Sequence, residues 1–431
     1  MTQEKKHSGT GQDCPKGYKS CDGYRIPKEW HIVRFDSLFS RVTRKNDENN
    51  QNVLTISAQQ GLISQIEYYN TLYASENKTG YTLLHRGDFS YNKSYSSGYA
   101  YGAIKRLDAY EKGIVSPLYL CFTPRQGVNS DFYLQYFEAG CFDREIYKIA
   151  QEGARNHGLL NVSTEDFFHS MLVFPPLEEQ ERITEFLTQC DHVIELKEQK
   201  LDELKQLKKE FLRKMFPAKG CDTPEIRFPG FTGAWEQRKL GDVVEIKDSA
   251  RIPNKEWSDT GVPYIRASDI SGENLEGTLF IAPQRYEFYK NKTGAPLYGD
   301  VLFNGGGEIG KALFNNDNKP IYVQGGAVLY ARTSISNELE GSYLKTYYET
   351  IHSRKYIDAA SAGGTMKHFT LKPAQEMPIY LPDVGEQEQI GKFFIQLDTL
   401  IILHQRELEE TKTYKKTLAK LLLTGIVRVQ G

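Results

Sequence analysis

The chain repeats one segment of its own sequence half a chain later. The stretch FPPLEEQERITEFLTQCDHV runs from Phe174 to Val193, and the stretch LPDVGEQEQIGKFFIQLDTL runs from Leu381 to Leu400. The triplet Glu-Gln-Glu at 179–181 recurs at 386–388, which is 207 residues later. At the same offset Ile183, Phe186, Gln189 and Asp191 recur as Ile390, Phe393, Gln396 and Asp398. A repeat at a fixed offset predicts that the chain folds as two similar units.

Two further pairs of segments extend the duplication toward the start of each half. EWHIVRFDSLF at 29–39 matches AWEQRKLGDVV at 234–244, with Trp30 opposite Trp235. RGDFSYN at 86–92 matches YGDVLFN at 298–304. The offset changes from 205 to 212 and returns to 207, which indicates short insertions between the matched segments.

The regions before the repeated Glu-Gln segments have a mixed α and β composition. Short strand-like runs are NVLTIS, GDFSYN, GIVSPLYLCF, GDVLFN and IYVQGGAVLYA, and turn residues such as Gly87-Asp88 and Gly299-Asp300 separate them. Tyr-rich stretches at 131–142 and 341–357 are helical candidates. We therefore expect an α+β fold for each globular region.

A long periodic segment follows each globular region. Its apolar positions step by four and three residues, a period of 3.5 that predicts a coiled-coil seam. Pro175 and Pro176 exclude an earlier helix start, and Pro217 and Gly220 end the first helix. The second helix ends near Gly425. The first seam is Ile183, Leu187, Cys190, Ile194, Lys197, Leu201, Leu204, Lys208, Phe211 and Met215, and the second is Ile390, Phe394, Leu397, Ile401, His404, Leu408, Thr411, Lys415, Leu418 and Leu422.

Polar residues interrupt the two seams at equivalent positions. Lys197 matches His404, and Lys208 matches Lys415. A polar seam residue can fix the register of two helices at a cost in stability. Alternatively, its long stem can carry the charge out to water. Both interpretations stay open from the sequence.

Two apolar stripes of equal length in one chain can cover each other. Each helix has roughly 35 residues, which gives about 50 Å at 1.5 Å per residue. The globular region between the helices allows the second to return antiparallel to the first. The sequence thus predicts two pseudo-two-fold-related globular domains separated by two long antiparallel coiled-coil helices. A spacer of about 50 Å is close to one and a half turns of B-DNA at ~34 Å per turn, so two heads could read two short sites.

The composition excludes some classes of protein. The net charge of −2 does not indicate a nucleic-acid partner, although a local basic patch is compatible with it. The six cysteines form no C-x-x-C pair, which favours reduced thiols in a cytoplasmic protein. The first ten residues, MTQEKKHSGT, lack the apolar core of a signal peptide. No apolar run approaches the ~20 residues that a membrane span needs.

Several of these motifs together resemble the specificity subunits of type I restriction-modification systems. They are VFPPLEEQERITEFL with its copy, VLTISAQQGLISQIEYYN, GYTLLHRGDFSYNKS, YIRASDI and GGTMKHFTLKPAQEMPIYLP. The resemblance covers nearly the whole chain from about Gly23. It is weaker at the start of the second helix, where LPDVGEQ stands and the family usually has a second Pro and a Leu.

The resemblance implies two target-recognition domains, each reading one half of a split site in double-stranded DNA. It also implies that the helices dock two methyltransferase subunits, which restriction subunits then join. The chain itself is expected to perform no chemistry and to bind no metal or cofactor, with S-adenosylmethionine, ATP and Mg required by the partner subunits. The expected divisions are an N-terminal tail (1–22), target-recognition domain 1 (23–176), helix 1 (177–216), target-recognition domain 2 (217–383), helix 2 (384–425) and a C-terminal tail (426–431).

One glycine-rich stretch suggests a rival chemistry. GGGEIGKA at 305–312 fits G-x-x-x-x-G-K, but Ala312 stands where a phosphate-binding loop needs Ser or Thr for magnesium. The first half keeps Gly98, Gly102 and Lys105 without such a pattern. We expect a glycine-rich loop that approaches a DNA backbone, or a plain turn. No adenine-methyltransferase or nuclease motif is recognisable, and single histidines such as His85 are more often structural than catalytic.

Candidate DNA contacts follow from the chemistry of bases and phosphates. Lys, Arg, Ser, Thr and backbone amides suit phosphates, whereas Arg or Lys suits guanine and Asn or Gln suits adenine. Candidates in the first domain are Tyr91, Asn92, Lys93, Ser94, Tyr95, Lys105, Arg106, Arg155, Asn156 and His157. Candidates in the second domain are Arg266, Ser268, Asn304, Glu308, Lys311, Thr365, Lys367 and His368. The alternative for each is ordinary strand or loop surface.

Two other functions fit parts of the sequence. A non-enzymatic, two-headed coiled-coil adaptor that binds proteins or glycans would explain the duplication and composition equally well. An ATPase built on Gly305–Lys311 is the weaker alternative. Neighbouring genes for an adenine methyltransferase and a helicase-nuclease would favour the DNA-reading subunit.

Overall fold

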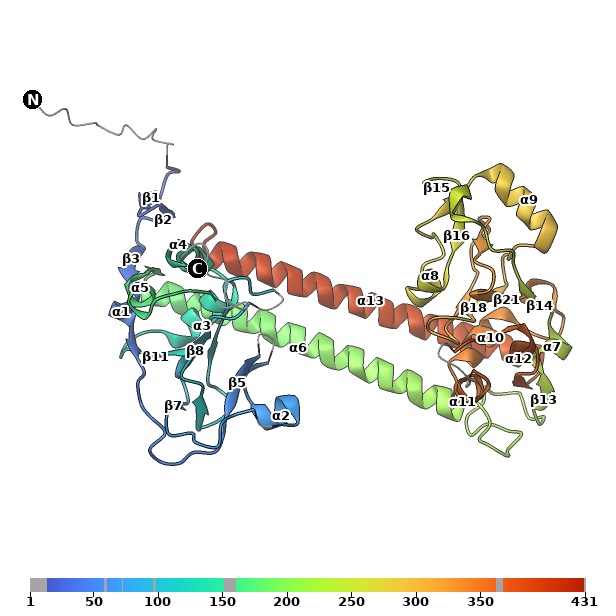
Figure 1. Ribbon diagram of the computed structural model, residues 1–431, viewed down its shortest axis with the longest axis horizontal. Helices are drawn as coiled ribbons and strands as arrows, with labels where there is room; N and C mark the ends of the chain where they lie inside the picture. Colours follow the sequence, from blue (N-terminus) through green and yellow to red (C-terminus); the bar gives the residue numbers. More distant parts are fainter. Residues whose placement is uncertain are drawn as a thin grey trace, which may run out of the picture. The chain divides into compact units, whose positions relative to one another are not determined.

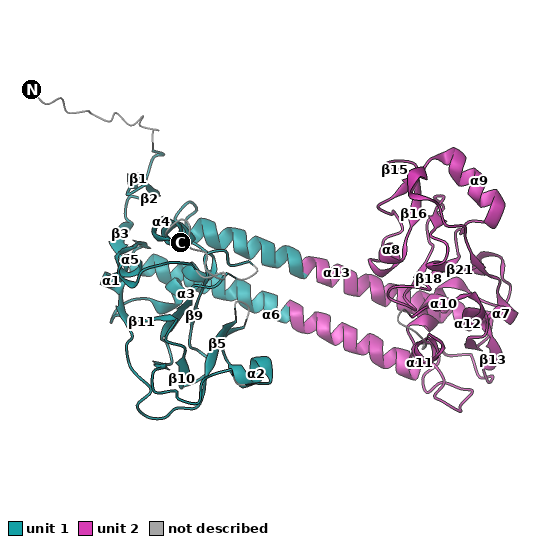
Figure 2. Ribbon diagram, viewed as in Figure 1, with its two compact units in different colours: residues 1–196, 408–431 teal, residues 197–407 magenta. Residues whose placement is uncertain are grey.

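The structure is a computed structural model that describes residues 14–57, 60–71, 73–95, 98–150, 160–361 and 367–429. It divides into two compact units, which Figure 2 colours separately. Unit 1 comprises residues 1–196 and 408–431, and unit 2 comprises residues 197–407. Each long helix thus contributes one half to each unit.

Unit 1 is built on a four-stranded antiparallel sheet in the order β4-β11-β8-β9. Its two central strands, β8 and β11, are labelled in Figure 1. Its strands are β4 (Phe39–Arg41), β8 (Phe89–Asn92), β9 (Ala103–Arg106) and β11 (Leu120–Pro124). The helices α1 (Phe35–Leu38), α3 (Ser130–Glu138), α4 (Asp143–Ile149) and α5 (Thr164–His169) share one aromatic core with this sheet. In that core the ring centroids of Phe35 and Phe122 lie 4.9 Å apart, edge to face.

Further strand pairs complete unit 1. β3 (His31–Arg34) pairs with β12 (Met171–Phe174), β5 (Leu54–Ser57) with β6 (Gly61–Ser64), and β7 (Thr82–His85) with β10 (Lys112–Val115). The short helix α2 (Gln65–Tyr69) follows β6. The run GIVSPLYLCF is not one strand, because the turn at Ser116–Tyr119 separates β10 from β11.

Unit 2 contains a sheet of the same construction, ordered β14-β21-β18-β19. In both units the strands that are first, fourth, second and third along the chain lie in that order across the sheet. β13 (Glu236–Lys239) pairs with β22 (Pro378–Leu381), as β3 pairs with β12. This shared topology confirms the duplication inferred from the sequence. The sheet strands are β14 (Ile246–Asp248), β18 (Val301–Asn304), β19 (Ala312–Phe314) and β21 (Val328–Ala331).

The helices of unit 2 are α7 (Leu240–Val243), α8 (Ala267–Ser271), α9 (Pro283–Thr293), α10 (Gly341–Tyr348), α11 (Ile351–Ala360) and α12 (Leu371–Gln375). A second sheet, in the order β15-β17-β16-β20, is specific to this unit. Its strands are β15 (Trp257–Ser258), β16 (Val262–Ile265), β17 (Phe280–Ile281) and β20 (Tyr322–Val323). Buried Tyr264, Tyr289 and Tyr322 build a separate small core there.

The two long helices are α6 (Leu177–Lys214) and α13 (Val384–Leu423), close to the expected bounds. Within unit 2, Lys197 donates to Glu407 at 3.0 Å, and Lys208 contacts Asp398 at 2.5 Å. Residue numbers rise along α6 as they fall along α13, so the helices are antiparallel. In unit 1 the matching contact joins Lys415 to Asp191 at 2.5 Å. The seam lysines therefore meet carboxylates of the opposite helix, which supports a register-setting role.

The predicted seam positions are buried or half-buried, with one exception. Leu418 is 36% exposed, whereas its neighbour Ala419 is only 4% exposed and belongs to the core of unit 1. The prediction of Leu418 as a seam residue was wrong. An α-helix has 3.6 residues per turn, so a strict 3.5-residue period drifts, and here the seam takes a step of four after Lys415.

The repeated Glu-Gln segment fixes the start of each long helix. Glu179 is almost fully buried and accepts hydrogen bonds from Trp30 Nε1 and Arg428 Nη2, both at 2.8 Å. Its counterpart Glu386 is fully buried and accepts from Arg227 Nε at 2.8 Å and Nη2 at 2.7 Å. In each case the arginine comes from the segment that follows the other long helix. The buried carboxylate is thus neutralised at the positive end of its own helix dipole.

The glutamines of the same motif hold the chain that enters each helix. Gln180 Nε2 donates to the carbonyl of Pro175 at 2.8 Å, and Gln387 Nε2 donates to the carbonyl of Pro382 at 3.0 Å. Both glutamines are buried. The structural purpose of the repeat is therefore to anchor two equivalent helix starts.

The expected tail boundaries fall inside folded structure. β1 (Tyr18–Cys21) and β2 (Tyr24–Pro27) form a hairpin that crosses the expected boundary at residue 22. Tyr18 Oη donates to the carbonyl of Ile426 at 3.0 Å, so the hairpin packs on the segment that follows α13. No helix in the described part of the chain has the length and apolar character of a membrane span.

Candidate DNA interface

The first-domain candidates surround the end of β8 in unit 1. Tyr91 is buried, and its hydroxyl donates to the carbonyl of Tyr101 at 2.8 Å. Asn92 accepts a bond from the backbone amide of Ser94 at 3.0 Å. Lys93 Nζ donates to the carbonyl of Val162 at 2.6 Å, and burial lowers the pKa of this lysine. Tyr95 is 67% exposed.

The two cations on β9 have internal partners. Lys105 is buried and forms an ion pair with Glu138 at 2.6 Å. Arg106 pairs with Asp108 and with Asp131, both at 2.7 Å. These contacts neutralise both side chains within unit 1. Arg155, Asn156 and His157 lie outside the described residues.

The second-domain candidates come from three segments that meet in unit 2. Asn304 at the end of β18 is fully buried, and its Nδ2 donates to the carbonyl of Ala267 at 3.0 Å. Arg266 precedes α8, where its Nε donates to Asp269 at 3.3 Å and its Nη2 to Thr278 at 2.6 Å. Ser268 in α8 is exposed. Asn304 thus ties the end of β18 to α8 and leaves Ser268 on the surface.

The glycine-rich stretch connects two antiparallel strands, β18 and β19. A phosphate-binding loop of the nucleotide-binding type instead leads from a strand into a helix. The amides of Gly305 and Gly306 both donate to the carbonyl of Ala327, so they are engaged within the protein. Gly305 permits a close approach, because a Cβ there would lie 2.6 Å from the carbonyl oxygen of Phe369. The geometry therefore disfavours the ATPase alternative.

The same loop brings the remaining candidates together. A Cβ on Gly306 would lie 3.6 Å from His368 Nδ1, which places His368 beside the loop. Glu308, Lys311, Lys367 and His368 are all exposed. Thr365 lies outside the described residues. The exposed candidates Ser268, Glu308, Lys311, Lys367 and His368 are called the polar surface of unit 2 below.

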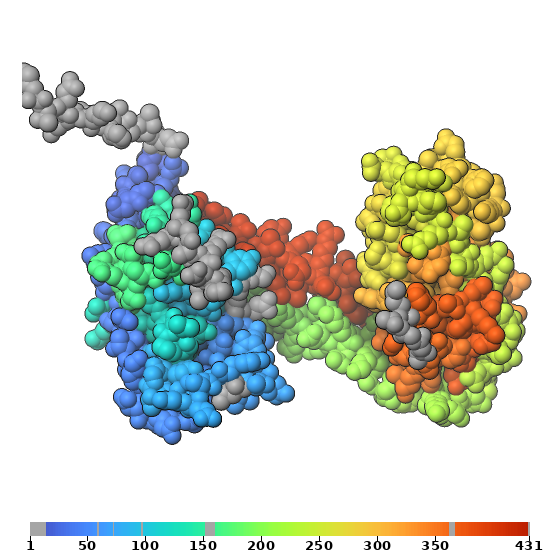
Figure 3. Space-filling view, viewed as in Figure 1, coloured from blue at the N-terminus to red at the C-terminus, as the bar shows by residue number. Residues whose placement is uncertain are grey.

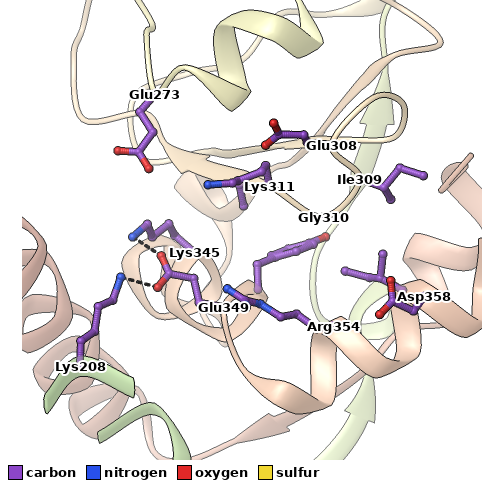
Figure 4. Close-up of a pocket in the computed structure, with 13 residues that line it drawn as sticks. Lys208, Glu273, Glu308, Ile309, Gly310, Lys311, Lys345, Glu349, Arg354 and Asp358 are labelled. Atoms are coloured by element: carbon purple, nitrogen blue, oxygen red, sulfur yellow. Dashed lines mark hydrogen bonds and ion pairs between the residues drawn. The ribbon is translucent and has the colours of Figure 1, made fainter. Parts of the chain in front are cut away.

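A cavity of about 460 Å³ opens behind this loop, as Figure 4 shows. Glu308 and Lys311 come from the loop, and Arg354 and Asp358 come from α11. Lys311 and Arg354 form no ion pair with any described residue. Arg354 was not among the sequence-based candidates, because its stretch was interpreted only as a helix. Its position beside Lys311 makes it a further candidate for a phosphate contact.

A second apolar stripe on the long helices also escaped the sequence analysis. In unit 1 it consists of Phe186, Val193 and Leu196 on α6, with Leu196 51% exposed. In unit 2 the positions 207 residues later are Phe393, Leu400 and Leu403 on α13. Leu400 is 41% and Leu403 is 52% exposed, whereas Phe393 is half-buried against the core of unit 2. Figure 3 shows side chains of α6 and α13 at the molecular surface. The steps of seven and three residues form a heptad stripe that could have been found by counting.

Three exposed tyrosines gather around α2 in unit 1. Tyr68 and Tyr69 lie edge to face with ring centroids 4.6 Å apart, and Tyr69 and Tyr73 lie likewise at 5.1 Å. Their side chains are between 44% and 70% exposed.

No group of three or more His, Cys, Asp or Glu among the described residues could hold a metal ion.

Known proteins share this organisation. The model of the type I restriction modification DNA specificity domain matches twice, at residues 27–206 and 233–413. A type I restriction enzyme specificity subunit, MjaVIII of Methanocaldococcus jannaschii, is 22% identical over 96% of this chain and 97% of its own length. The putative MjaX specificity subunit of the same organism is 25% identical over 72% of this chain and 71% of its own length.

Solved structures agree on the fold. The S subunit of a type I restriction-modification system from M. genitalium has a TM-score of 0.53 at 15% identity, covering 91% of this chain and 96% of that one. A chain from a structure of type I restriction-modification complex assembly has a TM-score of 0.57 at 18% identity, covering 93% and 98%. The two matches of the family model together span most of the sequence. This chain therefore belongs to the type I restriction-modification DNA specificity family.

Proposed function

We propose that this specificity subunit reads a bipartite DNA target, with one half of the target assigned to each unit. The observation that carries the proposal is the pairing of one sheet topology with two different loop surfaces. The end of β8 and the loop after it carry Asn92, Ser94 and Tyr95, whereas the loop after β18 carries Glu308 and Lys311. Equal frameworks with unlike contact residues suit the recognition of two unlike sequences.

The proposed contacts differ from the full set of candidates. Tyr91, Lys105 and Asn304 have internal partners and are proposed to position the loops. The polar surface of unit 2, together with Arg354, is proposed to meet the DNA. Lys311, Lys367 and Arg354 suit phosphate oxygens, and His368 and Glu308 suit base edges. In unit 1, Asn92, Ser94 and Tyr95 are proposed to contact the DNA. Lys93 and Arg106 are proposed to hold the segments around them through their internal partners.

Two copies of a methyltransferase subunit are proposed to dock on the second apolar stripe. The stripe occurs twice, once on α6 in unit 1 and once on α13 in unit 2, at positions related by the sequence repeat. Val193 and Leu196 are exposed in unit 1, as Leu400 and Leu403 are in unit 2, and similar apolar surfaces suit two copies of one partner. The chain then needs no cofactor of its own. S-adenosylmethionine is proposed to serve the methyltransferase subunits, and ATP and Mg the restriction subunits of a full complex.

The modest net charge of −2 agrees with shared binding of DNA, because partner subunits can neutralise many of the phosphates. The test is methylation of a random-sequence DNA library by the co-purified complex, read by sequencing of methylated adenines. A split motif with an unread gap supports the proposal. Methylation without a motif, or at one uninterrupted motif, contradicts it.

A further inference from the structure

A closed ring of four charges joins the second recognition domain to its helix pair within unit 2. Lys208 of α6 contacts Glu349 and Asp398, both at 2.5 Å. Lys345 of α10 contacts the same two carboxylates at 2.6 and 2.5 Å. Figure 4 shows Glu349 joined by a dashed line to each of Lys208 and Lys345, which line the cavity behind the glycine-rich loop. Each lysine thus bridges both acids, and the ring carries no net charge.

All four side chains are largely removed from water, with exposed fractions between 16% and 23%. Burial by itself lowers the pKa of Lys345, but the charges of Glu349 and Asp398 outweigh burial, and the net pKa is raised. Partly buried charges are stabilising only when every member keeps its partners. The ring therefore joins α6, α10 and α13 through contacts that each leave a partly buried charge when they are lost.

Unit 1 contains the same junction in a simpler form. Asp191 of α6 takes the place of Asp398, and Lys415 of α13 takes the place of Lys208, each at the offset of 207. Gln135 of α3 completes the junction, since its Nε2 donates to Asp191 at 3.1 Å. In both units an acid on one long helix thus holds a lysine of the other helix and a donor from the recognition domain.

The correspondence between α3 and α10 is fixed by a second pair of contacts. Tyr133 Oη donates to the carbonyl of Val173, and Tyr343 Oη donates to the carbonyl of Tyr380, at 2.9 and 2.5 Å. The carbonyl residues belong to the corresponding strands β12 and β22 of the two units. At the resulting offset of 210, Lys345 corresponds to Gln135, and Glu349 corresponds to Ala139.

We propose that these junctions are positioning devices, and that Asp398 and Lys345 hold the second recognition domain in one orientation on the helices so that the complex accepts one gap length between half-sites. The inference rests on the proposed function. α10 faces the glycine-rich loop across one cavity, because Ile309 and Lys311 of the loop and Lys345 of α10 line it together. Rocking of α10 on Asp398 would therefore move the loop that is proposed to contact DNA.

The repeat supplies a matched pair of test variants. Lys345→Gln combined with Glu349→Ala copies the junction of unit 1, and keeps a donor for Asp398. Lys345→Met combined with Glu349→Ala has the same net charge and a side chain of similar length, but no donor. The two variants differ only in the hydrogen bond that the proposal treats as decisive.

The complex of each variant with its methyltransferase subunits is given a mixture of targets whose gap is the natural length or one or two base pairs shorter or longer. Methylated adenines at each target are counted in the same reaction, so a loss of folded protein lowers all counts equally. In the Met variant, methylation at non-natural gaps relative to the natural gap is expected to rise about tenfold or more, which corresponds to about 1.4 kcal/mol. The Gln variant is expected to keep the unaltered profile.

Equal profiles in the two variants, whether sharp or broad, would overturn the positioning role. A wild-type complex that methylates no split target would instead contradict the proposed function. The two failures are therefore distinguishable within one experiment.

Discussion

Removal of Arg227 tests how the repeated Glu-Gln segment stabilises the helix starts. Arg227 and Glu386 form a two-fold hydrogen-bonded ion pair at 2.8 and 2.7 Å, with the Glu386 side chain 1% and the Arg227 side chain 15% exposed. Arg227→Met leaves a buried carboxylate without its counter-ion, which costs about 3–5 kcal/mol. For a unit of this size, about 2–4 °C is lost per kcal/mol, so the unfolding transition of unit 2 should fall by roughly 6–20 °C.

The assay is differential scanning calorimetry of the full chain, with Arg227→Met/Glu386→Gln as the control. The double variant removes the charge together with its partner, so it should recover most of the lost stability. The transition of unit 1 should not move in either variant. A fall of less than about 1 kcal/mol in the single variant, or no recovery in the double variant, would refute the reasoning.

Three further outcomes follow from the described contacts. Leu196→Glu and Leu403→Glu should each weaken binding of one methyltransferase copy, giving complexes with one copy instead of two by native mass spectrometry; two retained copies would exclude the stripe as the dock. Lys311→Gln should lower the slope of log affinity against log salt by about 1, with the target sequence unchanged. Burial lowers the pKa of His352, so the unfolded chain takes up this proton first and unit 2 should lose stability as pH falls through about 6.5. His352→Gln should flatten that pH dependence in thermal unfolding, and an unchanged slope would assign it to other groups.

The sequence was sufficient to predict helices and strands that are determined by neighbouring residues or by the internal repeat. Pro176 excludes helix at the start of α6, and α6 accordingly begins at Leu177. The duplication predicted two similar units because matched segments must form matched strands, and β3 and β13 do so. The antiparallel helix pair followed from two apolar stripes of equal length.

The candidate site was harder to predict, because residue type does not reveal a side chain's partners. Lys105 has the chemistry of a phosphate contact, yet Glu138 lies across the fold and pairs with it. Asn304 has the chemistry of an adenine contact, but it is buried and its Nδ2 donates to the carbonyl of Ala267. Both partners are distant in sequence, so only tertiary packing could identify them. Leu418 shows the related limit for helices, where a drift of one residue moves a side chain off the seam.

The expected boundaries of the N- and C-terminal tails also missed contacts between residues that are distant in sequence. Arg428 lies in the segment expected to be a C-terminal tail, yet its Nη2 donates to the buried Glu179 at 2.8 Å. A basic residue after a helix end has no local feature that distinguishes an ion pair from a solvated side chain. The run IYVQGGAVLYA holds two strands, β20 and β21, which belong to different sheets. The second sheet of unit 2 was missed because its other short strands, β15 and β17, are only two residues long.

Independent reading by the two units is tested most directly by exchanging one unit's recognition domain. Residues 25–175 would be replaced with the equivalent part of another family member, and the methylated adenines of the resulting complex would be mapped. The account predicts that one half of the split target changes while the other half stays the same. A change in both halves, or a change in neither, would contradict it.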